Sequence, residues 1–75
     1  MLRKGMWVLY QGKVGILAAR FHDEGEVHLV DKEGMTIAVL PLVPLSSCAQ
    51  ASYDDIPEAR RPQPGLARAL GYLHT

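Results

Sequence analysis

The chain has 75 residues, enough for one small domain and too few for two. Hydrophobic residues make up 48% of it and charged residues 21%, which excludes wholesale disorder. No apolar run reaches the roughly 20 residues of a membrane-spanning helix, and no apolar segment typical of a secretory signal follows the basic N-terminus. Its single cysteine cannot form an internal disulfide, so we expect a cytoplasmic protein, and the lack of a long apolar run predicts no membrane association.

Eight basic and eight acidic residues give a net charge of zero, but their distribution is uneven. Residues 1–20 carry four basic residues and no acidic one. Residues 21–58 carry all the acidic residues and a single base, Lys32, and residues 59–75 add three arginines. This pattern predicts either a polarised surface or charges that pair within the fold, and both readings stay open.

A first hairpin is predicted around Gln11-Gly12, a two-residue turn between the apolar segments 6–10 and 13–19. Glycine in the second position suits a tight turn that needs a positive φ. Gly15, inside the second segment, indicates a bulge or a close approach of a neighbouring backbone. Residues 21–25 are expected to form a loop or a distorted hairpin end.

A second hairpin is predicted from the alternation in residues 26–30, where Val27 and Leu29 share one face. Residues 31–34 have the aspartate and glycine of a short turn, and residues 35–40 follow as the partner strand.

Pro41 and Pro44 remove backbone donors, so strand pairing must stop there or the strand must lie at an edge. Three residues near these prolines are too apolar to lie in water. We expect them to cross the open end of the sheet: Leu42, Val43 and Leu45.

The segment after the second hairpin changes from strand to helical patterns. Residues 48–53 are expected to form a short fifth strand. Asp55 has the form of an N-cap for a helical turn that must end before Pro62, because the residue preceding a proline disfavours helix. Residues 62–65 form a stiff spacer.

A helix is predicted to run to about residue 73, with one stripe of leucines: Leu66, Leu70 and Leu73. A helix of this length is marginal alone. We therefore expect the stripe to dock against the strands or against a second copy of the chain, which would make this a dimer helix.

Four to five short antiparallel strands joined by tight glycine turns favour a mainly β fold. We expect a small barrel over residues 1–53 with a helical extension over residues 54–75, both within a single domain.

Lys4–Val8 followed by Gly12–Leu17 resembles the opening of SH3-like small barrels, especially KOW-type modules. Residues 27–30 and 35–39 resemble the next two strands, and residues 42–46 resemble the turn before the last. The resemblance covers about residues 3–53 and implies an SH3-like barrel that binds RNA or proteins of the transcription and translation apparatus. A small chain of this make-up also resembles accessory proteins of bacteria or prophages.

Catalytic and metal chemistry finds little support in the sequence. His22, Asp23, His28 and Cys48 match no zinc-ligand spacing. A nucleophilic pair of Cys48 with a histidine and a carboxylate pair at residues 54–55 are formal alternatives, but packing explains the cysteine and capping explains Asp55. We expect no enzyme activity, no cofactor and no metal.

Partner binding is instead assigned to aromatic and basic residues: Trp7, Tyr10, Lys13, Arg20 and Tyr53. Tyr10, beside the first turn, is expected to be accessible, whereas Trp7 is either exposed or packed under the C-terminal helix. Arg3, Lys4, Lys13 and Arg20 would form a basic margin.

Two functions follow from these residues. The first is a protein-binding or assembly module, and the second is a KOW-like binder of RNA through the basic N-terminal hairpin. The acidic stretch from Asp23 to Glu33 departs from the basic character of RNA-binding modules and favours the first.

Overall fold

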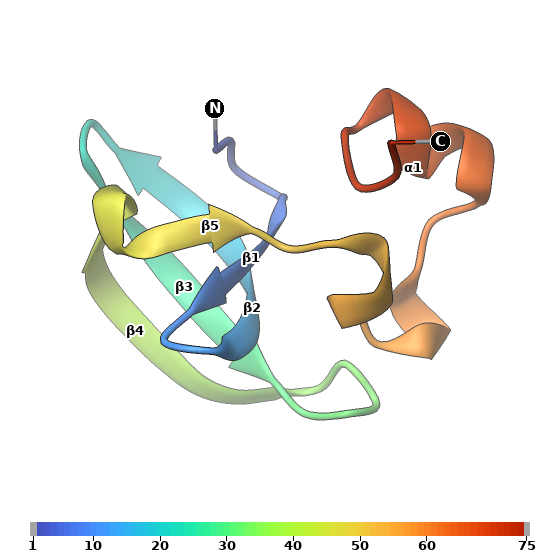
Figure 1. The fold of residues 1–75 in the computed structure, drawn as a ribbon. Coiled ribbons are helices and arrows are strands. Elements are labelled where there is room, and N and C mark those ends of the chain that lie inside the picture. The colour runs from blue at the N-terminus through green and yellow to red at the C-terminus, as the bar shows by residue number, and fades with distance from the viewer. Residues whose placement is uncertain (1, 75) are drawn as a thin grey trace.

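The computed structural model describes residues 2–74 as a single antiparallel sheet with the helical turns of the C-terminal segment at one side (Figure 1). The strand order is β4-β3-β2-β1-β5. The strands are β1 (Trp7–Tyr10), β2 (Lys13–Phe21), β3 (Glu24–Val30), β4 (Thr36–Pro44) and β5 (Cys48–Gln50). Three 3₁₀ turns and one helix complete the chain: η1 (Leu45–Ser47), η2 (Tyr53–Asp55), η3 (Glu58–Arg60) and α1 (Pro64–Ala69). The mainly β fold with a short C-terminal helix is as predicted.

The first hairpin is confirmed. Gln11 and Gly12 have φ values of 52° and 75°, and β1 pairs with β2 on either side of them. Two positive φ values define a turn whose twist matches that of the strands. Gly15 makes the close approach that the sequence indicates, because a Cβ atom there would lie 2.8 Å from the carbonyl oxygen of His28.

Of the two readings for residues 21–25, the loop is wrong and the hairpin end is confirmed. β2 continues to Phe21 and β3 begins at Glu24, so that only His22 and Asp23 lie between the paired strands. His22 takes a φ of 63°, in the left-handed region that histidine enters more readily than most residues. The turn therefore needs no glycine, and its sequence does not look like a turn.

β4 continues past Pro41 and ends at Pro44, which pairs with Glu24. Prolines are tolerated there because β4 is an edge strand with one unpaired side. The three apolar residues that were expected to cross the open end of the sheet differ in burial. Val43 is buried and Leu45 is half-buried, but Leu42 is exposed, so the prediction was wrong for Leu42.

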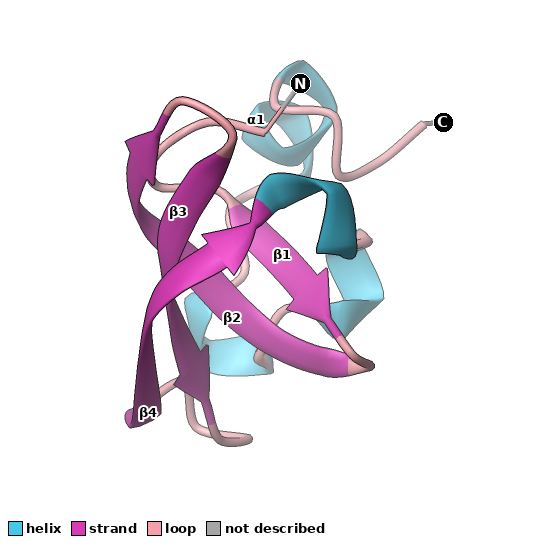
Figure 2. Ribbon diagram, turned by 90° about the vertical axis from the view of Figure 1, so that its left-hand side faces the viewer, coloured by secondary structure: helices cyan, strands magenta, loops and turns pink. Residues whose placement is uncertain are grey.

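A hydrophobic cluster lies on each face of the sheet. The inner face, around which the strands curl, buries Val8, Leu17, Val27, Leu29 and Val43. On the opposite face the C-terminal segment packs over β1 and β2, so that Trp7 is buried with Ile56, Ala67 and Tyr72. Figure 2 shows the helical turns of this segment behind the strands.

The C-terminal segment is capped differently from the prediction. Asp55 does not cap η3. It accepts a hydrogen bond from the backbone N–H of Ser52 at 2.9 Å and so closes η2. η3 does end before Pro62, as expected.

α1 ends at Ala69 rather than near Leu73. Gly71 adopts a φ of 88°, and the N–H of Tyr72 donates to the carbonyl of Ala67 at 2.8 Å, a glycine-terminated helix end. Leu66 and Leu70 are 55% and 48% exposed, so their predicted docking against the strands is wrong. Leu73 is half-buried against the Trp7 cluster. Packing of the two exposed leucines against a second copy stays a prediction.

The division into a barrel (residues 1–53) and an extension (residues 54–75) also stays a prediction, and Met1 and Thr75 lie outside the described residues. No helix within residues 2–74 has the length and apolar character needed to cross a membrane.

Substitution of Gly15 by alanine should destabilise the protein by about 1–3 kcal/mol, because the added methyl group meets the β3 backbone and cannot be accommodated by side-chain movement. Gly65→Ala is the matched control. Its added Cβ meets nothing within 4 Å and lies in α1, so the variant should be as stable as the parent or more so, by up to about 1 kcal/mol. Urea unfolding of both variants measures the difference. Equal effects would contradict the packing described for Gly15.

Candidate functional site

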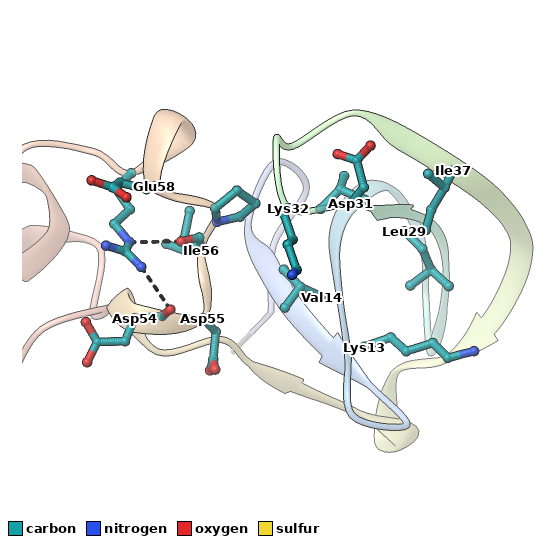
Figure 3. Close-up of a pocket in the computed structure, with 13 residues that line it drawn as sticks. Lys13, Val14, Leu29, Asp31, Lys32, Ile37, Asp54, Asp55, Ile56 and Glu58 are labelled. Carbon is teal, nitrogen blue, oxygen red and sulfur yellow. Dashed lines mark hydrogen bonds between the residues drawn. The ribbon is translucent and has the colours of Figure 1, made fainter.

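The candidate site is a groove of about 560 Å³ between the C-terminal segment and the strands (Figure 3). Its floor is apolar, made by Val14, Val30, Ile37, Ile56 and Pro57. Ile56 and Pro57 are buried, whereas Ile37 is 65% exposed. The groove thus offers apolar surface that the fold itself leaves uncovered.

Strand ends and a loop form one side of this groove, which we call the strand wall. Lys13 and Val14 begin β2 directly after the first hairpin turn, and Lys32 lies in the loop between β3 and β4. Asp31 shapes that loop by accepting hydrogen bonds from the N–H groups of Glu33 and Met35, at 3.0 and 2.9 Å.

Residues 54–61 form the other side, the C-terminal wall, and Arg61 holds it in place. Arg61 Nε donates to the carbonyl of Ile56 at 2.9 Å, and Nη2 donates to the carbonyl of Asp54 at 3.1 Å. The same guanidinium lies 5.6 Å from the centre of the Tyr53 ring, whose hydroxyl donates to the carbonyl of Pro62. These contacts preorganise the wall before any partner arrives.

Arg60 ties the C-terminal wall to the strands. Its Nη1 donates to the carbonyl of Gly34 at 2.8 Å, and its guanidinium lies 5.4 Å from the centre of the Trp7 ring. Since Gly34 belongs to the same loop as Lys32, this arginine sets the spacing between the two walls.

The two walls carry opposite charge. In Figure 3, Asp54, Asp55 and Glu58 lie on the C-terminal segment, across the groove from Lys13. The ion pair between His28 and Glu26, 2.6 Å apart, lies on β3 outside the groove lining.

Two of the aromatic residues predicted to bind a partner serve the fold instead. Trp7 is buried, as its alternative reading held, and its backbone N–H donates to the Tyr72 hydroxyl at 2.8 Å. Tyr53 is half-buried and engaged with Arg61 and Pro62. Neither ring is free to stack on a ligand.

Tyr10 and Lys13, by contrast, lie together at the end of the first hairpin. They line a second hollow of about 340 Å³ with the exposed Leu42 and with Pro41. Lys13 and Leu29 line both hollows, so the groove and this second hollow meet at Lys13.

The predicted basic margin does not form one patch. Lys13 and Arg20 lie at opposite ends of β2, about 23 Å apart at the rise of an extended strand. Arg20 is instead near the N-terminus, since its Nη1 donates to the carbonyl of Leu2 at 3.0 Å. Arg3 and Lys4 line a more polar hollow beside Tyr72.

The residues considered for metal or nucleophilic chemistry do not gather. Residues 2–74 contain no group of three or more His, Cys, Asp and Glu side chains placed to hold a metal ion. Cys48 is half-buried at the start of β5, with its thiol directed to the carbonyl of Pro44 at 3.8 Å.

Burial raises the pKa of the Cys48 thiol, because desolvation disfavours the thiolate. Iodoacetamide should therefore alkylate Cys48 more slowly at neutral pH than it alkylates glutathione, and the rate should keep rising above the ordinary thiol pKa of about 8.5. A rate that levels off below that pH would show an activated thiol and contradict this assignment.

Most residues that line the groove were not predicted from the sequence. Ile37, Ile56 and Lys32 come from three separate segments, and no spacing along the chain links them. The absence of charge from Met35 to Tyr53 was the one available sign that β4 exposes apolar side chains. Comparison of the chain with protein-family models, curated proteins and solved structures finds no match in any of the three.

Proposed function

We propose that this protein is a non-enzymatic binding module with an SH3-like barrel, and that it takes a peptide segment of a protein partner in the groove between its two walls. The barrel part of the proposal is supported by the strand order, in which β5 returns beside β1 after a meander of four strands. It is also supported by η1 at Leu45–Ser47, directly before β5, close to the turn that the resemblance implies at residues 42–46.

The observation that carries the function is the groove itself. Its volume of about 560 Å³ lies within the range of protein ligand sites, about 300–1,000 Å³, and its floor is apolar. An exposed isoleucine in a preformed, apolar hollow favours a protein partner, because burial of such a side chain supplies affinity without rearrangement of the module.

Selection of random displayed peptides against the full-length protein tests the proposal. We expect enriched peptides that no longer bind the Ile37→Arg variant, in which the groove floor is blocked. The same peptides should still bind the Lys4→Glu variant, in which the N-terminal end of the sheet is altered. Failure to enrich any peptide, or enrichment that Lys4→Glu alone abolishes, would overturn the proposal.

A nucleic-acid function remains the second candidate because Arg3, Lys4 and Arg20 lie near one another at the N-terminal end of the sheet. If this end binds RNA, labelled RNA should bind more weakly as salt rises, and Arg20→Glu should weaken it further. Lys13→Glu is the matched control, since Lys13 lies at the far end of β2. The candidate fails if no salt-sensitive binding of RNA or DNA occurs at tens of micromolar protein.

A further inference from the structure

We infer that the groove recognises an extended peptide segment that presents an aliphatic side chain between a cationic and an anionic group, an inference that rests on the proposed function. The cationic group faces the C-terminal wall and the anionic group faces the strand wall. The argument starts from the asymmetry of charge across the groove.

The C-terminal wall carries three carboxylates, Asp54, Asp55 and Glu58, and two guanidiniums. Of these two, the guanidinium of Arg61 lines the groove, whereas that of Arg60 is directed to Gly34 and Trp7. The strand wall carries two ammonium groups, Lys13 and Lys32, against one carboxylate, that of Asp31. A segment that lies between the walls is therefore in an electric field that runs from the strand wall to the C-terminal wall.

Several of these charges are already committed to the fold. Arg61 holds backbone carbonyls, Asp55 closes η2 at Ser52, and Asp31 closes its own loop. The remaining charged side chains are all exposed, and none belongs to the His28–Glu26 ion pair: Asp54 and Glu58 on one wall, Lys13 and Lys32 on the other.

The floor and the walls together restrict the ligand. A purely apolar segment would cover Ile37 but would also desolvate the exposed charges on both walls without pairing them, which is costly. A segment with charges of one sign would be attracted by one wall and repelled by the other. A nucleic-acid strand is a strong case of the latter, because its phosphates would face Asp54 and Glu58.

An aliphatic residue with oppositely charged neighbours satisfies both the floor and the two walls. Its apolar side chain covers Ile37, and its flanking groups pair with the walls. In an extended segment of the polyproline II type, which has three residues per turn, the two neighbours of a central side chain point to either side of it, so they can face opposite walls while the central side chain faces the floor.

Reversal of the charges on the two walls tests the inference. Three full-length variants are needed: Lys13→Glu with Lys32→Glu, Asp54→Lys with Glu58→Lys, and all four substitutions together. All four positions are exposed, and far-UV circular dichroism with urea unfolding checks that each variant folds. The probes are the synthetic peptide most enriched on the parent protein and the same peptide with its cationic and anionic residues exchanged.

The parent should bind the enriched peptide at least about tenfold more tightly than the exchanged peptide. Each single-wall variant should lose most of that preference, and the four-fold variant should reverse it. Such a reversal is a gain of binding, which misfolding cannot produce.

Equal affinity of the parent for both peptides, or an unchanged preference in the four-fold variant, would overturn the inference and leave the proposed function standing. If no peptide is enriched at all, the proposed function and the inference fail together.

Discussion

Deletion of residues 62–75 should lower the free energy of unfolding by at least about 3 kcal/mol, because it removes Tyr72 and Ala67 from the cluster around Trp7. Loss of a buried aromatic side chain alone costs about 3–5 kcal/mol. A domain of this size has a total stability of only about 4–11 kcal/mol. The truncated chain should therefore unfold at a much lower urea concentration, and its Trp7 fluorescence should report an exposed ring.

Three single substitutions separate the contributions within that segment. Tyr72→Phe should cost about 1–3 kcal/mol, since the N–H of Trp7 loses its buried acceptor. Leu66→Ala and Leu70→Ala should each stay within about 0.5 kcal/mol of the parent as monomers, because both side chains are exposed.

A truncated chain that melts and sediments like the full chain would show that the segment is a passive tail. A concentration-dependent loss of stability in the leucine variants, with a lighter species in sedimentation, would instead support a dimer through α1.

Substitution of Ile37 by arginine should reduce affinity for groove-binding peptides by at least about tenfold, or about 1.4 kcal/mol, while leaving the free energy of unfolding within about 0.5 kcal/mol. The side chain is exposed, so the fold loses little, but a guanidinium on the groove floor removes apolar contact and adds an unmatched charge. Fluorescence anisotropy with an enriched, labelled peptide measures the affinity.

Val39→Arg and Met35→Arg are close controls. Both residues are apolar, more than half exposed and on or beside β4 like Ile37, but neither lines the groove. They should bind the peptide as the parent does. A loss of affinity shared by all three variants would place the peptide on the outer surface of β4 instead of in the groove.

The sheet was predictable because its main determinants are local. Gln11-Gly12 fixes the first turn, residues 31–34 fix the third, and alternation in β3 sets the buried face. The second turn stayed open between a loop and a hairpin end because His22 supplies the positive φ, a conformation that sequence alone rarely assigns to a non-glycine residue.

The C-terminal segment was predicted less well because tertiary packing overrides its leucine spacing. Gly71 ends the helix early and directs Tyr72 to Trp7, so Tyr72 and Ala67 make the contact that Leu66 and Leu70 were expected to make. The groove depends on that packing. Its walls come from residues about 20 to 50 positions apart in the chain, and no local pattern places them together.

Two-dimensional NMR of the full-length, isotopically labelled protein during titration with an enriched peptide is the most direct test of the central claim that the groove is the binding surface. The largest amide shifts should fall on Val14, Lys32, Ile37 and Ile56, with little change at Arg3, Lys4 and Arg20. Shifts confined to those N-terminal basic residues, or to the exposed face of α1, would contradict the assignment of the groove.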